Sequence, residues 1–274
     1  MKHTKIIVRT KSKFYPIYFG SGIVDSTSMY LNKNLPNVKK IAIITDKNLP
    51  TIILKRLCKN LKNFKIKIYR LSISEKKKNF KVAYGLAENL LKDNFNRSDC
   101  VIALGGGILG DISAFVASIT KRGLKFINIP TSLLAQVDAS IGGKTAVNSI
   151  QGKNLIGTFY QPDFVIIDIS FLKSLPQREM VCGYAEILKH SLILDRKFFF
   201  WLSNNAKQII ENKNNQLLKL AIIKSCKIKS EIVIKDEKEQ NSRMVLNFGH
   251  TFAHGFEGAI NFSKKLNHGE AVLL

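Results

Sequence analysis

The sequence predicts an α/β protein in which a Rossmann-like domain with a parallel sheet is followed by an α-helical domain. Two observations lead to this prediction. Over about the first 170 residues, short β-branched runs alternate with amphipathic stretches, which is the pattern of a parallel sheet covered by helices. From Gln177 onward an apolar period of about 3.6 residues dominates, and convincing strands disappear. We therefore expect two domains, residues 1–174 and residues 175–274.

Seven apolar runs of the first domain are strand candidates: residues 6–9, 17–19, 41–45, 65–71, 101–104, 126–129 and 165–168. Several of these runs end directly in polar or glycine residues, as βα turns do. Asp46 follows one run, three glycines follow another, and Pro130 with Thr131 and Ser132 follows a third. Because ligands of open α/β sheets gather at the carboxyl ends of the strands, these turns are the expected binding edge.

The second domain contains three helix candidates, residues 179–194, 217–234 and 244–259. Each shows apolar residues at helical spacing. Connectors rich in Asn and Lys separate them.

Composition indicates an ordinary globular protein with mean hydropathy of zero. No stretch reaches about 18 uninterrupted apolar residues, and no cleavable leader pattern follows Met1. The cysteines, Cys58, Cys100, Cys182 and Cys226, are far apart and form no CxxC pair, which favours reduced thiols. We expect a cytoplasmic protein that is neither exported nor membrane-spanning.

The charge balance is strongly basic, with 43 Lys and Arg against 20 Asp and Glu, a formal net charge of +23. Such a balance raises nucleic-acid binding as a hypothesis. The lysines are scattered through nearly every segment, however, and form no single tract interleaved with aromatic residues. This distribution favours solvated surface lysines, together with the binding of an anionic small molecule. No nucleic-acid partner is expected.

A glycine-rich turn is the first candidate binding motif. Gly105, Gly106 and Gly107 stand between a buried strand and a helix expected to start at about Ile108. Glycine allows close backbone approach to a pyrophosphate, and a helix N-terminus favours negative charge. A dinucleotide phosphate site and a turn made only for tight packing both fit this motif. Asp46 fits either a ribose hydroxyl or a helix cap.

Residues 129–148 are richer in functional groups than a connector requires. Hydroxyl groups stand at the strand end, Asp138 supplies a carboxylate, and Lys144 follows a Gly-Gly turn. Lys153 and Asn154 are further polar residues that directly follow a glycine. An ordinary loop with surface lysines explains any one of these residues, but the cluster as a whole favours a binding segment.

The helical domain carries candidate metal ligands. Glu186 and Lys189 lie three apart and share a helix face, with His190 beside them. His250 and His254 lie four apart, without the following Glu that marks zinc proteases. Three of the five histidines fall between positions 250 and 268. Two imidazoles and a carboxylate with an open position would suit a catalytic zinc, although a lone helical His is more often a core or surface residue.

These motifs, taken in order, resemble the 3-dehydroquinate synthase family within the wider group of sugar-phosphate cyclases. The resemblance covers essentially the whole chain through residues 74–78, 105–111, 121–123, 130–148, 152–162, 183–189, 247–257 and 268–272. It implies conversion of 3-deoxy-D-arabino-heptulosonate 7-phosphate to 3-dehydroquinate and phosphate in the shikimate pathway, which is a lyase reaction of aromatic amino-acid and chorismate biosynthesis. NAD would be used transiently, through oxidation, phosphate elimination, reduction and aldol closure.

The resemblance also assigns roles to residues. The metal, Zn²⁺ with Co²⁺ as an alternative, would be held by Glu186, His250 and His268. The catalytic groups would be Asp138, Lys144, Lys189, Glu239 and His254. The substrate would be bound by Arg122, Lys144, Lys153, Asn154, Lys229, Arg243 and Asn247. NAD would be bound by Asp46, Glu75, Lys78, Gly106, Gly107, Ile108, Gly110, Asp111, Thr131, Ser132, Lys144, Lys153, Phe171 and Ser174. Arg122 resembles an arginine donated across a dimer interface, so a homodimer is expected.

Some features depart from the family pattern. Ser74 stands where glycine is usual, Ser132 where a second threonine is common, and the residues before Lys121 are less aromatic. Relatives continue past the segment of His268, so the second domain is expected to be incomplete relative to the family.

Several alternatives remain at this stage. An inactive, truncated remnant is one alternative, and another NAD- and metal-dependent cyclase or a glycerol-dehydrogenase-like enzyme is another. Lys229, Arg243 and Asn247 together favour a carboxylated, phosphorylated substrate over glycerol.

Overall fold

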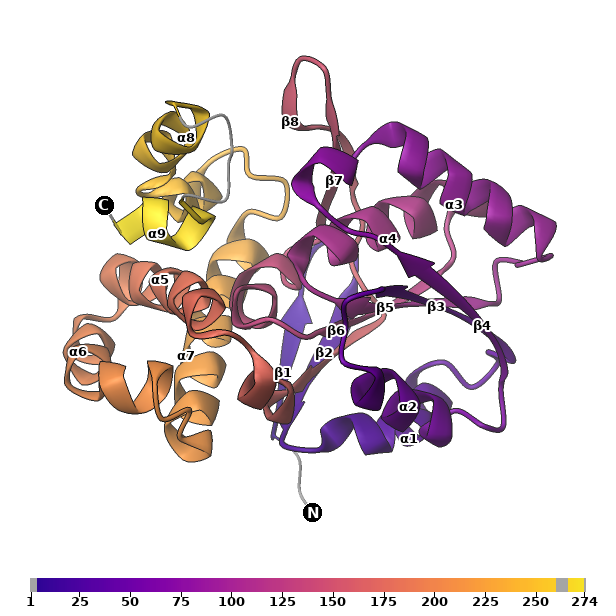
Figure 1. The fold of residues 1–274 in the computed structure, drawn as a ribbon, viewed down its shortest axis with the longest axis horizontal. Coiled ribbons are helices and arrows are strands. Elements are labelled where there is room, and N and C mark those ends of the chain that lie inside the picture. Colours follow the sequence, from indigo (N-terminus) through magenta and orange to yellow (C-terminus); the bar gives the residue numbers. More distant parts are fainter. Residues whose placement is uncertain (1–3, 260–265, 274) are drawn as a thin grey trace.

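The computed structural model describes residues 4–259 and 266–273, without the side chains of His254, Glu257, His268 and Leu273. Within these residues, seven strands form one sheet in the order β1-β2-β9-β6-β5-β3-β4 (Figure 1). The strands are β1 Thr4–Arg9, β2 Phe14–Gly20, β3 Lys40–Asp46, β4 Lys65–Leu71, β5 Cys100–Gly105, β6 Lys125–Pro130 and β9 Phe164–Asp168. All seven strand predictions are confirmed. Every neighbouring pair is parallel except β1 and β2, which form an antiparallel pair at one edge.

Helices cover both faces of the sheet (Figure 1). They are η1 Ile23–Ser26, α1 Thr27–Asn34 and α2 Thr51–Asn60 on one face, and α3 Phe80–Lys92 and α4 Gly107–Ile119 on the other. Side chains alternate accordingly along β3. Ile41 and Ile43 pack with α1 and α2, whereas Ala42 and Ile44 pack with α3 and α4. This two-sided burial explains why the central strands read as continuous apolar runs.

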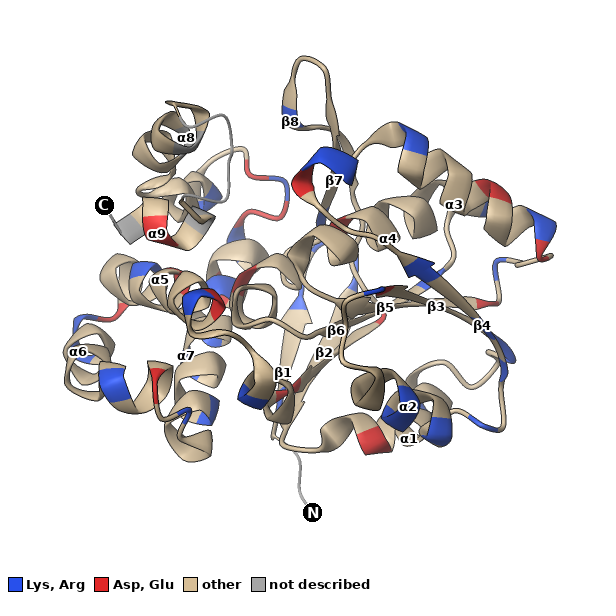
Figure 2. Ribbon diagram, viewed as in Figure 1, with Lys and Arg blue, Asp and Glu red and all other residues tan. Residues whose placement is uncertain are grey.

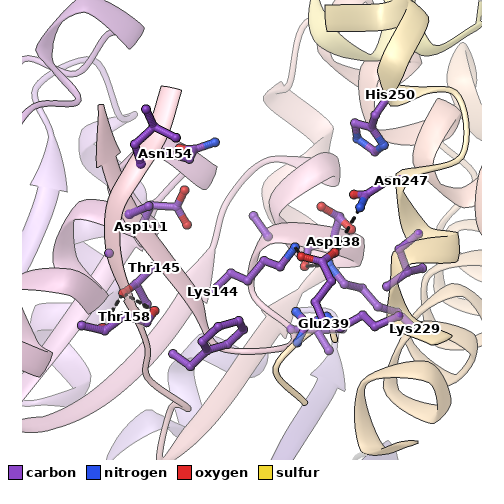
Figure 3. A pocket seen from close by; sticks show the side chains of 18 of the residues that line it. Asp111, Asp138, Lys144, Thr145, Asn154, Thr158, Lys229, Glu239, Asn247 and His250 are labelled. Carbon is purple, nitrogen blue, oxygen red and sulfur yellow. Dashed lines mark hydrogen bonds and ion pairs between the residues drawn. The ribbon is translucent and has the colours of Figure 1, made fainter. Parts of the chain in front are cut away.

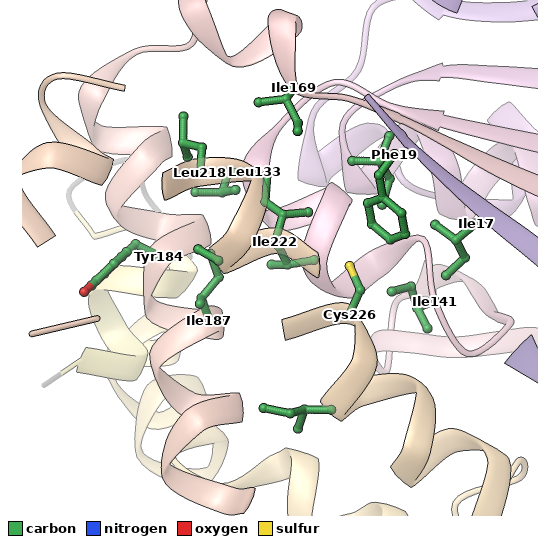
Figure 4. Packing of buried hydrophobic residues seen from close by; sticks show 14 of the residues in the cluster. Ile17, Phe19, Leu133, Ile141, Ile169, Tyr184, Ile187, Leu218, Ile222 and Cys226 are labelled. Carbon is green, nitrogen blue, oxygen red and sulfur yellow. The ribbon is translucent and has the colours of Figure 1, made fainter. Parts of the chain in front are cut away.

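The second half of the chain is helical and packs against the β1–β2 edge. Its helices are α5 Gln177–Leu194, α6 Arg196–Ile210, α7 Asn215–Lys235, α8 His250–Ala259 and α9 His268–Leu273. Ile17 and Phe19 of β2 share a buried cluster with Ile187 of α5 and Ile222 of α7 (Figure 4). The α/β fold followed by a helical region is therefore confirmed, while the domain boundary between residues 174 and 175 stays a prediction.

The structure corrects the prediction of one continuous helix over residues 244–259. A 3-10 turn, η6 Ser242–Asn247, precedes α8, and the two are separated by Phe248 and Gly249. Gly249 has φ of 80°, in the left-handed region that cannot continue an α-helix. The break re-aims the chain so that α8 begins at His250.

Helix α6 occupies a stretch that was expected to be a connector. Its N-cap Asp195 accepts a 2.8 Å hydrogen bond from the Phe198 amide. Phe198, Leu202 and Ile209 are buried along one face. The capping signal and the spacing were both present in the sequence.

A two-stranded antiparallel hairpin, β7 Lys144–Ser149 and β8 Gly152–Phe159, was not predicted from the sequence. Most of β8 is exposed, so it lacks the alternation of apolar and polar residues that identifies a half-buried strand. Gly157 is required at its position because a Cβ there would lie 2.1 Å from the Thr145 carbonyl oxygen. The hairpin projects from the sheet beside the helical region (Figure 1).

Candidate functional site

A cavity of about 590 Å³ lies between the helix α4, the hairpin and the helical region (Figure 3). The polar and charged residues that line the cavity are Asp111, Asp138, Lys144, Thr145, Asn154, Thr158, Lys189, Lys229, Glu239, Arg243, Asn247 and His250. They come from segments spread over more than half of the chain. The fold thus brings together ten of the polar residues that the sequence assigned to catalysis, substrate, cofactor or metal.

On the sheet side, the glycine-rich turn joins β5 to α4. Gly106 is the N-cap of α4 and carries no side chain, so the amides of the first helical turn face outward without a cap. A Cβ added to Gly106 would have Ser132 Oγ, 3.6 Å away, as its nearest neighbour. The Thr131 amide donates to the Gly105 carbonyl at 2.9 Å, which places Thr131 and Ser132 beside this turn.

The other residues predicted to bind a dinucleotide surround the same edge of the sheet. Asp46 ends β3, which is the neighbour of β5, and its Oδ1 accepts from the Asn48 amide at 2.8 Å instead of capping α2. Phe171 and Ser174 lie in the turn η5 Ile169–Ser174, which directly follows β9. The Phe171 side chain is buried in the core.

Lys78 ties the sheet to the hairpin. Its ammonium group lies 2.5 Å from Asp111 Oδ2 and 2.5 Å from Asn154 Oδ1. The side chain of Lys78 is only 6% exposed, so this charge depends on its two oxygen partners. Burial raises the pKa of Asp111, and the Lys78 charge opposes that shift.

The hairpin is anchored a second time close to its turn. The Asn148 amide group donates to Glu75 Oε1 at 2.7 Å, and Asn148 Oδ1 accepts from the Asn154 amide at 2.9 Å. Glu75 belongs to the 3-10 turn η2 Glu75–Lys77 after β4. Residues predicted to touch the cofactor and the substrate therefore share one hydrogen-bond network.

Lys144 reaches across the cavity from the first residue of β7. Its ammonium group pairs with the Glu239 carboxylate, which also accepts from Asn247 Nδ2 at 3.3 Å (Figure 3). Gly142 and Gly143 precede it with φ of 102° and 67°. A Cβ on Gly142 would lie 2.4 Å from the Arg243 guanidinium, so glycine permits the approach of that buried arginine.

Asp138 faces two buried cations. It lies in the short π-helical turn η4 Ala135–Ala139, and Lys229 Nζ lies 2.5 Å from Oδ1 and 2.6 Å from the main-chain oxygen. Burial alone would raise the pKa of Asp138, but the charges of Lys229 and Lys189 lower it well below its usual range. Burial lowers the pKa of Lys229, against the effect of Asp138. The carboxylate is thus held ionised.

Glu186 and Lys189 form a buried ion pair one turn apart on α5, with side chains 1% and 3% exposed. The Nε2 atom of His250 lies 3.9 Å from Glu186 Oε1, on the other side of the carboxylate. Two of the three predicted metal ligands therefore face each other. The side chains of the third, His268, and of the predicted acid–base residue His254 lie outside the described residues.

A second set of metal-ligand groups meets at the same carboxylate. Ligand atoms of Asp138, Glu186 and His190 all lie within 4.8 Å of one another. His190 is fully buried, with Nδ1 2.7 Å from Ser225 Oγ and Nε2 3.8 Å from Asp138 Oδ1. Burial lowers the pKa of His190 to about 3, so the imidazole is neutral and able to ligate a cation. A fully buried carboxylate beside imidazole nitrogens suits a divalent ion in either set.

No role for His190 was predicted from the sequence, although its spacing from Glu186 indicates one. Glu186 and His190 are four residues apart, so they share a face of α5. Thr145, Thr158 and Phe159 were also missed, because the hairpin that carries them was not predicted.

Two predicted substrate residues do not line the cavity. Arg122 is exposed at the end of the turn η3 Thr120–Arg122, beyond the C-terminal end of α4, whose N-terminal end meets the glycine turn. Lys153 flanks Asn154 at the start of β8. Arg122, Asn154 and Glu239 all have positive φ, of 62°, 58° and 55°. Such strain at non-glycine residues concentrates at functional positions.

Lys and Arg residues are distributed over the helices of both regions (Figure 2). Among residues 4–259 and 266–273, no helix combines the length and apolar character needed to cross a membrane.

Comparison with known proteins gives a consistent result. The family model described as 3-dehydroquinate synthase N-terminal matches residues 68–182, and the one described as 3-dehydroquinate synthase C-terminal matches residues 183–274. A 3-dehydroquinate synthase from Pelagibacter ubique is 52% identical over 270 residues, which are 98% of this chain and 73% of that protein.

Two solved structures share the fold closely. One is a 2-deoxy-scyllo-inosose synthase complexed with carbaglucose-6-phosphate, NAD⁺ and Co²⁺, with a TM-score of 0.87, 26% identity, and coverage of 98% of this chain and 74% of that one. The other is the 2-epi-5-epi-valiolone synthase of Streptomyces hygroscopicus with NAD⁺ and Zn²⁺ bound, with a TM-score of 0.86, 26% identity, and coverage of 96% and 73%.

Proposed function

The chain belongs to the 3-dehydroquinate synthase family, and we propose that it converts 3-deoxy-D-arabino-heptulosonate 7-phosphate to 3-dehydroquinate and phosphate. The observation that supports this substrate is the charge of the cavity. Lys144, Lys189, Lys229 and Arg243 all line it. A molecule that carries both a phosphate and a carboxylate needs several cations, and a buried guanidinium matches either group with paired hydrogen bonds.

NAD fits the sheet side of the candidate site. An uncapped helix N-terminus and the bare backbone of Gly106 leave room and hydrogen-bond donors for a pyrophosphate. The predicted contacts of Asp46, Thr131 and Ser132 lie at the carboxyl ends of β3 and β6, on the same edge. Bound there, NAD would supply reversible hydride transfer with no net redox change.

A divalent metal fits the helical side, and Zn²⁺ and Co²⁺ are the ions bound by the two structural relatives. We propose Glu186 and His250 as ligands, together with His268. When bound, the ion would supply Lewis-acid polarisation of a substrate hydroxyl. Glu186 is common to this set and to the group with Asp138 and His190, so its loss tests both.

The remaining side chains orient the substrate and move protons. Asp138 stays ionised beside Lys229 and so offers an acceptor at neutral pH. Lys144 and Glu239 pair with each other across the cavity, and a bound anion would compete with Glu239 for the lysine. The hairpin and the residues Glu239 and Arg243 would contact the substrate from opposite sides of the cavity.

The finer assignments of enzyme class, assembly and compartment belong to the same proposal. Elimination of phosphate makes the enzyme a carbon–oxygen lyase. Arg122, exposed and away from the cavity of its own chain, supports a homodimer in which it reaches the partner's cavity. Free cysteines, three of them buried, support a reducing cytoplasm. Sedimentation of the purified chain would test the dimer, because a monomer at micromolar concentration contradicts it.

The direct test of the function is phosphate release from the heptulosonate phosphate by the purified chain, with and without NAD and zinc. We expect turnover only when both are present. His268→Ala should abolish the metal-dependent release, and unchanged turnover would falsify the metal assignment. A folded chain that binds NAD but releases no phosphate would favour an inactive remnant.

A further inference from the structure

The loop of residues 236–243 follows α7, includes the first two residues of η6, and carries two groups of the cavity. Glu239 stands on it with φ of 55°, a conformation that a non-glycine residue holds only under constraint. Arg243 ends it, and its guanidinium is buried against Gly142. The loop must therefore be held in shape by contacts other than those of Glu239 itself.

Asp236 supplies the first set of constraints. Its Oδ1 accepts from the Gln240 amide at 3.0 Å, and its Oδ2 accepts from the amides of Asn241 at 2.7 Å and Arg243 at 3.1 Å. One carboxylate thus closes the loop from its first residue to its last. These hydrogen bonds, that from Gln240 first, lower the pKa of Asp236, which is the mark of a carboxylate that its donors stabilise.

Glu237 supplies the second set and fixes the loop to the rest of the molecule. Its carboxylate accepts from the Ser12 amide at 3.0 Å, from Ser12 Oγ, and from Gln161 Nε2 at 2.9 Å. Its main-chain oxygen accepts from Arg243 Nη1 at 2.5 Å. Ser12 lies in the β1–β2 turn and Gln161 just after β8, so one residue joins three distant segments.

The same contacts extend to the base of Lys144. A Cβ on Gly143 would lie 2.6 to 2.8 Å from the Gln161 amide group, so Gln161 packs directly on the residue that precedes Lys144. The contacts of Gln161 with Glu237 and Gly143 therefore fix the position of the loop relative to the hairpin. This position brings Lys144 and Glu239 together in the cavity.

We infer that Asp236 is a positioning residue of the reaction: it sets the strained backbone of Glu239 so that its carboxylate meets Lys144, while Glu237 anchors the loop to the β1–β2 turn and to β8. The inference rests on the proposed function, because it takes Glu239 as a group of the active site. Neither Asp236 nor Glu237 lines the cavity, so both act through the residues that they hold.

The test is a double-mutant comparison of kcat/KM for phosphate release. Asp236→Asn keeps the size of the side chain but places an NH₂ group against the amides, and should lower kcat/KM by roughly 10-fold through misplacement of Glu239. In the Glu239→Gln background the same change should cost only about 2-fold, because the carboxylate being positioned is already gone. Equal losses in the two backgrounds would overturn the inference.

A matched control is Asp195→Asn, which removes a carboxylate that accepts from the Phe198 amide at the start of α6. It should leave kcat/KM unchanged below the unfolding temperature. The loop itself is followed by hydrogen exchange: the amides of Gln240, Asn241 and Arg243 should exchange at least about 10-fold faster in Asp236→Asn. Unchanged exchange would overturn the role of Asp236 even if phosphate release fell.

Different measurements test the two proposals. If the unsubstituted chain, loaded with NAD and zinc, released no phosphate, the proposed function would be wrong, and so would a role of Asp236 in that reaction. The exchange rates would still show whether Asp236 holds the loop in shape.

Discussion

The two sides of the candidate site are built on different physical principles. The sheet wall is the turn at the ends of β5 and β6, which adjoins the cavity at Ala139 without lining it, and where glycines and an uncapped helix offer amide groups and open space. The helical wall is formed by buried charges, with Glu186 beside Lys189, and Lys229 beside Asp138. The space around the glycines decides which ligand fits the sheet wall. The pairing of buried charges decides whether the helical wall is stable.

The two walls suit different ligands. A cofactor that is bound through its phosphates needs amides and a helix terminus, which any glycine-rich βα turn provides. A metal ion and a charged substrate need groups with fixed ionisation, which only a buried and compensated cluster provides. The hairpin and the loop at residues 236–243 connect the two walls through Lys144 and Glu239.

The largest effect is expected from Glu186→Gln on the helical wall. Because the change leaves Lys189 buried without its counter-charge, the free energy of unfolding should fall by about 3–5 kcal/mol. Phosphate release should fall by at least about 100-fold, together with bound zinc. Chemical denaturation and metal analysis measure the two effects.

The control for this prediction is an exposed ion pair. Asp25 and Arg56 are 57% and 30% exposed, so Asp25→Asn should change stability by less than about 1 kcal/mol. Similar losses for the two variants would mean that the helical wall does not depend on charge compensation.

Lys144→Met tests the connection between the walls. Its side chain is 48% exposed, so the free energy of unfolding should change by less than about 0.5 kcal/mol. Phosphate release should nevertheless fall by roughly 100-fold, because the cation that meets the substrate is gone. Lys67→Met, at a comparably exposed pair with Asp93, is the control for loss of a surface charge. An unstable Lys144 variant with normal specific activity would make this lysine structural only.

Gly106→Ala tests whether shape governs the sheet wall. The new methyl group meets no protein atom closer than Ser132 Oγ at 3.6 Å, but it would occupy space expected for the dinucleotide. The dissociation constant for NAD should rise by about 10-fold, which corresponds to about 1.4 kcal/mol. Gly85→Ala in α3, where a Cβ meets nothing within 4 Å, serves as the control. Equal NAD affinity in both variants would contradict the predicted phosphate position.

The smallest effect is expected for the change of the free energy of unfolding with pH, which should respond in opposite directions when Glu237 and Asp111 are replaced. Burial would raise the pKa of Glu237, but hydrogen bonds from Ser12 and Gln161 lower it overall. A folded-state pKa below the unfolded value means that its stabilisation is present above about pH 4.3 and is lost as the pH falls through the folded pKa. Glu237→Gln should therefore flatten the decline of stability in acid.

For Asp111 the sign is reversed, because burial raises its pKa. Its contribution to stability is complete below the unfolded pKa, about 3.9, and is lost as the pH rises through the folded value. Asp111→Asn should steepen the decline in acid, since it removes a term that grows there. Denaturation curves of the metal-free, NAD-free chain between about pH 3 and pH 6 measure both effects. Parallel curves for the two variants would contradict the opposite directions of the two pKa shifts.

Most of the sheet and half of the helical region could be predicted from the sequence. Strands buried on both faces read as apolar runs, and the glycines after β5 mark the turn directly, because these signals are local. The hairpin was missed since β8 is largely exposed and carries no alternation. The continuous helix expected over residues 244–259 was wrong because Gly249 breaks it, and helical spacing of apolar residues does not report a backbone dihedral.

The type of each functional group and the family of the chain follow from the order of residues, because each motif is made of neighbours along the chain. Which groups share a site follows only from the folded arrangement. It placed Lys78 between Asp111 and Asn154, and it put His190 beside Asp138. It also gave the loop of Glu239 its two carboxylate anchors. These are contacts between segments far apart in the chain, and their energies arise from burial and charge compensation that exist only once the core has formed.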